Sequence, residues 1–146
     1  MARFTTSIAI SRERGLVYRE YLDPANFPRW VSNWLRMETP VGKPDEAGGQ
    51  NLVYFAGRSG EIVVEENIVS VEPGRRYVYV MRSPYTVSTV QVGFESEGTG
   101  TRIRWDNEVH GRNALWALLL PAIVPRMKAS IEHDLATLKQ MIESKV

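Results

Sequence analysis

Between Trp34 and His110 the sequence alternates between strand-like runs and short turn signals, and this pattern constrains the fold more than any other feature. The separators are GKPDEAGG, GRSG, PG, PY and GTG, and the runs between them are WLRMETPV, QNLVYFAG, EIVVEENIVSVE, RRYVYVMRS, TVSTVQVGFESE and TRIRWDNEVH. Connections this short join antiparallel neighbours, because a parallel pair needs a crossover of a dozen or more residues. The sequence therefore predicts an antiparallel meander of about six strands.

One more strand and two short helices are expected before the meander. The run FTTSIAIS, residues 4–11, alternates as a strand does and ends at Ser11, a residue type that caps helices well. Ser11 is therefore predicted to cap a helix over residues 12–22. Asp23 and Pro24 suit the cap and first position of a second helix, which a further proline limits to about one turn.

The C-terminal third, from about Asn113, is predicted to be helical. Its apolar residues recur at intervals of three and four, which gives an amphipathic helix that can lie on a sheet: Met127, Ile131, Leu135, Leu138 and Ile142. Unbroken from 113 to 145, this helix would be about 50 Å long, which is long for a domain with a radius of gyration of about 15 Å. Because Pro121 and Pro125 each remove a backbone hydrogen bond, a break or sharp kink is expected between residues 120 and 126.

The composition excludes several classes of function. The 146 residues suit a single domain spanning 1–146, and the absence of cysteine excludes disulfides and thiolate chemistry. With 18 basic and 17 acidic residues scattered along the chain, no nucleic-acid partner is expected. Only His110 and His133 are present, and neither lies in a metal-binding pattern, so neither a metal nor another cofactor is expected. Without a signal-peptide pattern or a transmembrane segment, a cytoplasmic protein is predicted.

Three stretches resemble a known superfamily: VYREYLDPANFPRW, VSVEPGRRYVYVM and GTGTRIRWDNEV. They are similar to the first helices, the central hairpin and the last hairpin of the START-like (Bet v 1-like, SRPBCC) superfamily, which includes the polyketide cyclase/dehydrase and lipid-transport families. The resemblance implies an α+β helix-grip fold, in which a curved antiparallel sheet of about seven strands wraps around a long C-terminal helix, with two short helices after strand 1. It also implies a cavity between sheet and helix that receives an apolar small molecule.

Eight residues are candidates for ligand binding because they lie on elements that would wall this cavity: Trp30, Tyr54, Tyr79, Trp105, Asn107, Trp116, Leu119 and Ile123. Large aromatic residues are also ordinary core residues, so each has a purely structural alternative. Asn107 shares the apolar face of the last strand with Ile103, Trp105 and Val109, and a buried amide needs a partner. A neighbouring side chain, a water or a ligand could provide it.

Adjacent acids at Glu65 and Glu66 lie in a predicted strand, where neighbouring side chains point to opposite faces. The favoured interpretation is a bulge that leaves both in solvent. The alternative is that one of them faces the cavity, where burial would raise its pKa and allow it to act as a general base or to pair with an arginine.

The run ALWALLLPAIVP, residues 114–125, has apolar side chains on every side of a helix, so one sheet cannot bury all of them. Three coverings remain open: loops at the cavity mouth, a second subunit in a homodimer, or a membrane or hydrophobic cargo. The preferred functional interpretation is a movable flap, hinged at the prolines, that admits an apolar ligand.

The sequence thus favours the binding or transport of a hydrophobic small molecule, such as a lipid, polyketide or isoprenoid, with no catalytic residue assigned. One alternative is a polyketide cyclase/dehydratase-type enzyme on the same scaffold, in which Tyr54, Tyr79, Asn107 and one of Glu65 or Glu66 move protons. Another is a module that docks on a protein or makes transient membrane contact through the apolar run.

Overall fold

The computed structural model describes residues 1–145. The elements follow one another in the order β1 (Ala2–Ile10), α1 (Arg14–Leu22), a 3₁₀ helix (Pro24–Asn26), α2 (Phe27–Trp30), β2 (Trp34–Val41), β3 (Gln50–Gly57), β4 (Gly60–Glu72), β5 (Arg76–Arg82), β6 (Thr86–Glu97), β7 (Gly100–Gly111) and α3 (Ala114–Glu143). Strands and helices thus segregate as predicted for an α+β chain.

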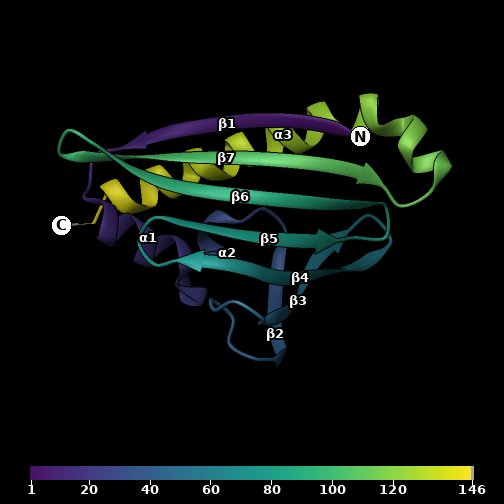
Figure 1. Ribbon diagram of the computed structural model, residues 1–146, viewed down its shortest axis with the longest axis horizontal. Coiled ribbons are helices and arrows are strands. Elements are labelled where there is room, and N and C mark those ends of the chain that lie inside the picture. Colours follow the sequence, from purple (N-terminus) through teal and green to yellow (C-terminus); the bar gives the residue numbers. More distant parts are fainter. Residues whose placement is uncertain (146) are drawn as a thin grey trace.

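All seven strands form one antiparallel sheet, in the order β1-β7-β6-β5-β4-β3-β2. Strands β2 to β7 pair in chain order, which confirms the predicted meander. Strand β1 closes the other edge by pairing with β7 over its whole length, from Ala2 opposite Val109 to Ile10 opposite Thr101. Figure 1 shows β2 and β3 turned steeply against the long strands β5, β6 and β7, so that the sheet curls around a concave face.

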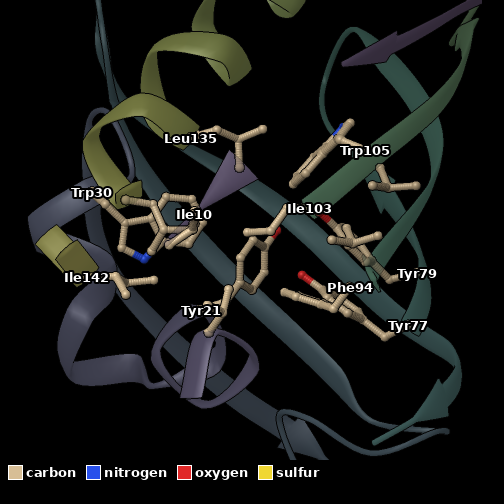
Figure 2. Close-up of a cluster of buried hydrophobic side chains, with 14 of the residues drawn as sticks. Ile10, Tyr21, Trp30, Tyr77, Tyr79, Phe94, Ile103, Trp105, Leu135 and Ile142 are labelled. Atoms are coloured by element: carbon tan, nitrogen blue, oxygen red, sulfur yellow. The ribbon is translucent and has the colours of Figure 1, made fainter. Parts of the chain in front are cut away.

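The concave face holds the hydrophobic core. The C-terminal half of α3 packs on β1 and β7, and its Leu135, Leu138 and Ile142 are almost completely buried. Helix α1 adds Val17 and Tyr21 from the other side. Figure 2 shows how Leu135 and Ile142 approach Ile10, Ile103 and the aromatic side chains of the sheet. The predicted amphipathic face of the last helix is thus the face that the sheet covers.

The start of α1 differs from the prediction. Glu13, not Ser11, caps this helix: its carboxylate accepts hydrogen bonds from the backbone N–H groups of Gly15 and Leu16 at 2.9 and 2.7 Å. Ser11 is engaged elsewhere, since its backbone N–H donates to the Glu143 carboxylate at 2.8 Å. The chain after β1 is therefore attached to the end of α3 before the helix begins.

Of the break or sharp kink predicted between residues 120 and 126, the break does not occur, because the helix is continuous from Ala114 to Glu143 with Pro121 and Pro125 inside it. Figure 1 shows instead that its axis bends in the N-terminal third, as prolines cause in long helices. Pro121 lacks the N–H that would bond the carbonyl of Ala117. Ala117 and Pro121 are both exposed, so water can donate a hydrogen bond to the free carbonyl of Ala117 and the helix can continue.

The beginning of α3 lies directly against the end of β7. A Cβ atom on Gly111 would come within 2.1 Å of the Ala117 backbone nitrogen, so no other residue type fits there without a shift. Asn113 caps the helix by accepting a hydrogen bond from the Trp116 N–H at 3.1 Å. From this point the first turns of α3 extend beyond the edge of the sheet (Figure 1).

Candidate functional site

A cavity of about 820 Å³ lies between the curled half of the sheet, α2 and the middle of α3. Its floor comes from the inward-facing residues of β3, β4 and β5, and its roof from α3 residues between Leu119 and Leu135. Among the strands, those on which the described part of α3 mainly packs are β1 and β7, so the curl of β2 to β5 leaves space beneath the middle of the helix. A volume of this size is typical of sites for small organic molecules.

Aromatic rings form much of the wall. Tyr77 and Tyr79 of β5 are stacked at 5.2 Å between ring centroids, and Tyr79 meets Trp105 edge to face at 6.4 Å. Tyr21 of α1 lies edge-on to Tyr77 at 5.8 Å and against Trp30 at 4.9 Å (Figure 2). Burial raises the pKa of Tyr21, Tyr77 and Tyr79, so all three remain neutral hydroxyl groups at physiological pH.

Glu66 is the most unusual residue of the lining. It lies on β4 between Val64 and Ile68 in the inward-facing series, and Asn51 of β3 donates to its carboxylate at 3.2 Å. Burial raises the pKa of Glu66 to about 7, and the hydrogen bond from Asn51 opposes this only partly. A carboxyl group that is half protonated near neutrality can donate or accept a proton inside the cavity.

The favoured interpretation of the paired acids is therefore wrong, since Glu66 faces the cavity. The bulge of β4 lies further along, between Ile68 and Ser70, so the alternation at Glu65 and Glu66 is undisturbed. Glu65 points to the other face of the sheet, where it accepts hydrogen bonds from Gln50 and Asn67.

A second carboxylate faces the cavity from α3. Asp134 accepts hydrogen bonds from both the hydroxyl and the backbone N–H of Ser32, which follows α2. Burial raises the pKa of Asp134, and the bonds from Ser32 oppose the change. Together with Asp45, three carboxyl groups line the cavity, against one cationic side chain, Arg126. No ion pair involves Asp45, Glu66 or Asp134 within residues 1–145.

The cavity opens along the exposed side of α3. Leu119, Ala122 and Arg126 belong to the lining and are also exposed to solvent. Across the opening lie Asn33 and Ala56, whose backbones are joined by a hydrogen bond of 2.8 Å. The opening of the cavity is therefore bordered on one side by the apolar N-terminal half of α3. On the other side it is bordered by the start of β2 and the end of β3.

Five of the eight ligand-binding candidates line this cavity: Trp30, Tyr79, Trp105, Leu119 and Ile123. Trp116 lines a smaller adjacent pocket of about 320 Å³, which shares Ile123, Met81, Tyr85 and Met127 with the larger one. Trp116 also packs on Tyr85, with 4.8 Å between ring centroids.

The remaining two candidates lie outside the cavity. Tyr54 is on the convex face, where its hydroxyl donates to Glu38 at 3.2 Å and Arg36 lies over its ring at 4.0 Å. Asn107 is in the core and only 2% exposed; neither its amide nitrogen nor its oxygen has a hydrogen-bond partner within residues 1–145. The partner expected for Asn107 is therefore not a protein group within residues 1–145.

Sequence reasoning missed several polar residues of the lining, chiefly Asn51, Asp134 and Ser32. Alternation along β3 places Asn51 on the same face as Val53, but only the burial of both in the structure shows that this face is the concave one. Asp134 precedes the buried Leu135 on α3, but its contact with Ser32 joins residues 102 apart and has no local signature. Within residues 1–145, no group of three or more His, Cys, Asp or Glu residues is arranged to hold a metal ion.

Comparisons with known proteins agree with this architecture. Residues 1–143 match the family described as polyketide cyclase/dehydrase and lipid transport. Among curated proteins, none matches the chain. Solved structures that it resembles include Ara h 8.0201, with a TM-score of 0.83, 12% identity and coverage of 99% of both chains.

Two further structures resemble the chain. Protein CV1439 from Chromobacterium violaceum has a TM-score of 0.75 at 13% identity, with 98% of both chains covered. DynU16, a protein of the dynemicin biosynthetic locus, has a TM-score of 0.73 at 16% identity, with 97% of this chain and 47% of that one covered. These likenesses confirm the helix-grip fold. The family match over almost the whole length establishes that the chain belongs to the polyketide cyclase/dehydrase and lipid-transport family.

Proposed function

We propose that this protein binds and carries a hydrophobic small molecule whose polar end is a hydroxyl, carbonyl or amine rather than a carboxylate. The observation that carries the proposal is the cavity itself, which is large, open along α3 and walled mainly by aromatic and aliphatic side chains. The family, whose description includes lipid transport, supports an apolar ligand.

The apolar wall would provide most of the affinity. Removal of apolar surface from water contributes about 25 cal/mol per Å² before the costs of association are subtracted. Flat rings fit the stacked pair Tyr77 and Tyr79 and the edge of Trp105, so an aromatic or polycyclic ligand would pack on them. The phenolic hydroxyls of the same tyrosines, which stay neutral, can donate to a carbonyl or hydroxyl of the ligand.

The charges of the lining limit the polar end of the ligand. A carboxylate would be placed among Asp45, Glu66 and Asp134, with Arg126 as the single cation, and like charges repel strongly where water is scarce. The positive charge of an amine would stabilise the ionised form of Glu66 and so offset the free-energy cost of burying that carboxylate. A neutral hydroxyl could accept a hydrogen bond from protonated Glu66 or donate one to its charged form.

Displacement of the neutral dye Nile red by decylamine, decanol and decanoic acid tests this proposal, because the three compounds share one alkyl chain. At about pH 8, where Glu66 is ionised, we expect decylamine and decanol to displace the dye at least about tenfold more effectively than decanoic acid. Wild-type protein that does not bind Nile red would contradict the carrier function. Preferential binding of decanoic acid would contradict only the charge preference.

Catalysis is a second candidate function, and the pKa of Glu66 is the observation that favours it. A general acid or base works best when its pKa is near the operating pH, and this carboxyl group lies among three tyrosines in a site that holds an apolar ligand. Cyclisation or dehydration of a flexible polyketide-like chain would need such a group. Turnover of a candidate substrate that is retained in full by Glu66→Gln would exclude this role.

A further inference from the structure

The first turns of α3 carry an exposed apolar face that nothing in residues 1–145 covers. Leu115 and Leu118 are 60% and 77% exposed, and Leu119 is 38% exposed. Ala114, Pro121, Ala122 and Pro125 are also exposed, and they lie on the same side of the helix as Leu118. In this segment only Leu120 is buried, so the sheet takes up one side of the helix and leaves the opposite side free.

The charged residues that flank the apolar segment in the sequence are all of one sign. Between Glu108 and Glu132 the sequence has no acidic residue, whereas Arg112, Arg126 and Lys128 lie near the two ends of the apolar segment and are exposed. Two amphipathic aromatic side chains, Tyr85 and Trp116, pack together beside its first turn. Exposed leucines, flanking cations and adjacent Tyr and Trp are the residue types that helices lying in a membrane interface present to anionic lipids.

We propose that the apolar face of α3, residues 114–125, docks on an anionic lipid bilayer, with Arg112, Arg126 and Lys128 against the headgroups. The charge distribution favours this occupant over a second copy of the chain, because a two-fold contact through this face would bring the same three cations of each copy together. The helix lies on the bilayer and does not span it, since its C-terminal half is fixed in the core by Leu135, Leu138 and Ile142.

Docking would also place the cavity mouth at the lipid surface. Leu119, Ala122 and Arg126 border the opening and belong to, or lie beside, the docking face. An apolar ligand could then pass from bilayer to cavity without crossing water. This last step depends on the proposed carrier function, whereas the docking itself does not.

Co-flotation with vesicles tests the docking. We expect wild-type protein to bind vesicles of three parts phosphatidylcholine to one part phosphatidylserine, and to bind pure phosphatidylcholine vesicles much more weakly. Leu118→Glu should weaken binding at least about tenfold, because it places a charge at the centre of the face. Lys128→Gln should weaken it about fivefold. Neither residue lines the cavity, and both are exposed, so the variants should fold and retain Nile red binding in solution.

Matched controls exist on exposed residues outside the docking face. Leu35→Glu changes another exposed leucine, on β2, and Lys43→Gln removes another exposed cation; both should bind vesicles like the wild type. The proposal is overturned if wild-type protein binds neither kind of vesicle, or if Leu118→Glu binds as well as Leu35→Glu. It is also overturned if the protein is a dimer in solution that Leu118→Glu converts to monomers, because the face is then occupied by a second copy. If the wild type binds vesicles but does not bind Nile red, the carrier function is contradicted and the docking proposal still holds.

Discussion

The protonation of Glu66 should make the stability of the protein depend on pH in a way that one substitution removes. The pKa of Glu66 is raised from the ordinary 4.5 to about 7 in the folded state, because the side chain is buried. Between these two values the folded protein binds more protons than the unfolded chain. The free energy of unfolding therefore falls as the pH rises through this window, and the full cost of burying the carboxylate is present above about pH 7.

The magnitude follows from the same two values. At about 1.4 kcal/mol for each pH unit, the difference between 4.5 and about 7 corresponds to at most about 3–4 kcal/mol. The side chain faces a cavity that can hold water, which screens its charge, so we expect about 2 kcal/mol. Glu66→Gln keeps the shape and can still accept the hydrogen bond from Asn51, but it cannot ionise.

Urea unfolding of wild type and Glu66→Gln, from about pH 4 to about pH 8.5, measures this effect. The variant should have the same stability as the wild type, or a lower one, at the acidic end, and its relative stability should rise by about 2 kcal/mol toward the basic end. Glu65→Gln is the matched control, because Glu65 points to the opposite face of the sheet and this variant keeps Glu66; its free energy of unfolding should therefore still fall toward basic pH as that of the wild type does. A stability difference for Glu66→Gln that is constant over the whole range would refute the buried-acid argument.

Other expectations concern the cavity, the core and the buried amide. Ala122→Trp at the mouth should slow Nile red association at least about tenfold in stopped-flow measurements, whereas Ala129→Trp, exposed on the same helix but away from the lining, should not. Leu138→Ala should lower the free energy of unfolding by about 2–5 kcal/mol, because Leu138 is fully buried between α3 and the sheet. Asn107→Leu should raise it by about 1–3 kcal/mol, since the amide has no partner within the described chain; a loss of stability in urea unfolding would show that water or a ligand bonds the amide. Tyr54→Phe on the convex face should leave Nile red affinity unchanged.

The fold could be predicted from the sequence because its signals are local. Turn residues at short intervals define the hairpins, and each hairpin fixes the pairing of its neighbours, so the order β2 to β7 follows from the chain itself. The alternation of Trp105 with Arg104 and Asp106 also identifies the concave face of β7. Only the position of β1 beside β7 depends on contacts between distant parts of the sequence, and for that the family resemblance was needed.

The site was less predictable because it depends on how distant elements meet. Strands with apolar residues on both faces, such as β3, give no local sign of which face is concave, and Tyr54 was assigned to the wrong side for that reason. The effect of Pro121 and Pro125 depends on solvent access to the carbonyls that they leave free, which the sequence does not show. The pairing of Asp134 with Ser32 is visible only once α2 and α3 are placed together.

The pairing of β1 with β7 has a consequence for how the protein is made. The first strand has no partner until the last one is available, and contacts such as Arg3 with Glu108 join residues 105 positions apart. At a synthesis rate of about 5–20 residues per second, the N-terminal strand stays without its partner for at least about 5 s on the ribosome. During that interval its unpaired edge and apolar side chains are open to other chains, so translation speed and nascent-chain chaperones should affect the yield of correctly folded protein more than substitutions in the later hairpins do.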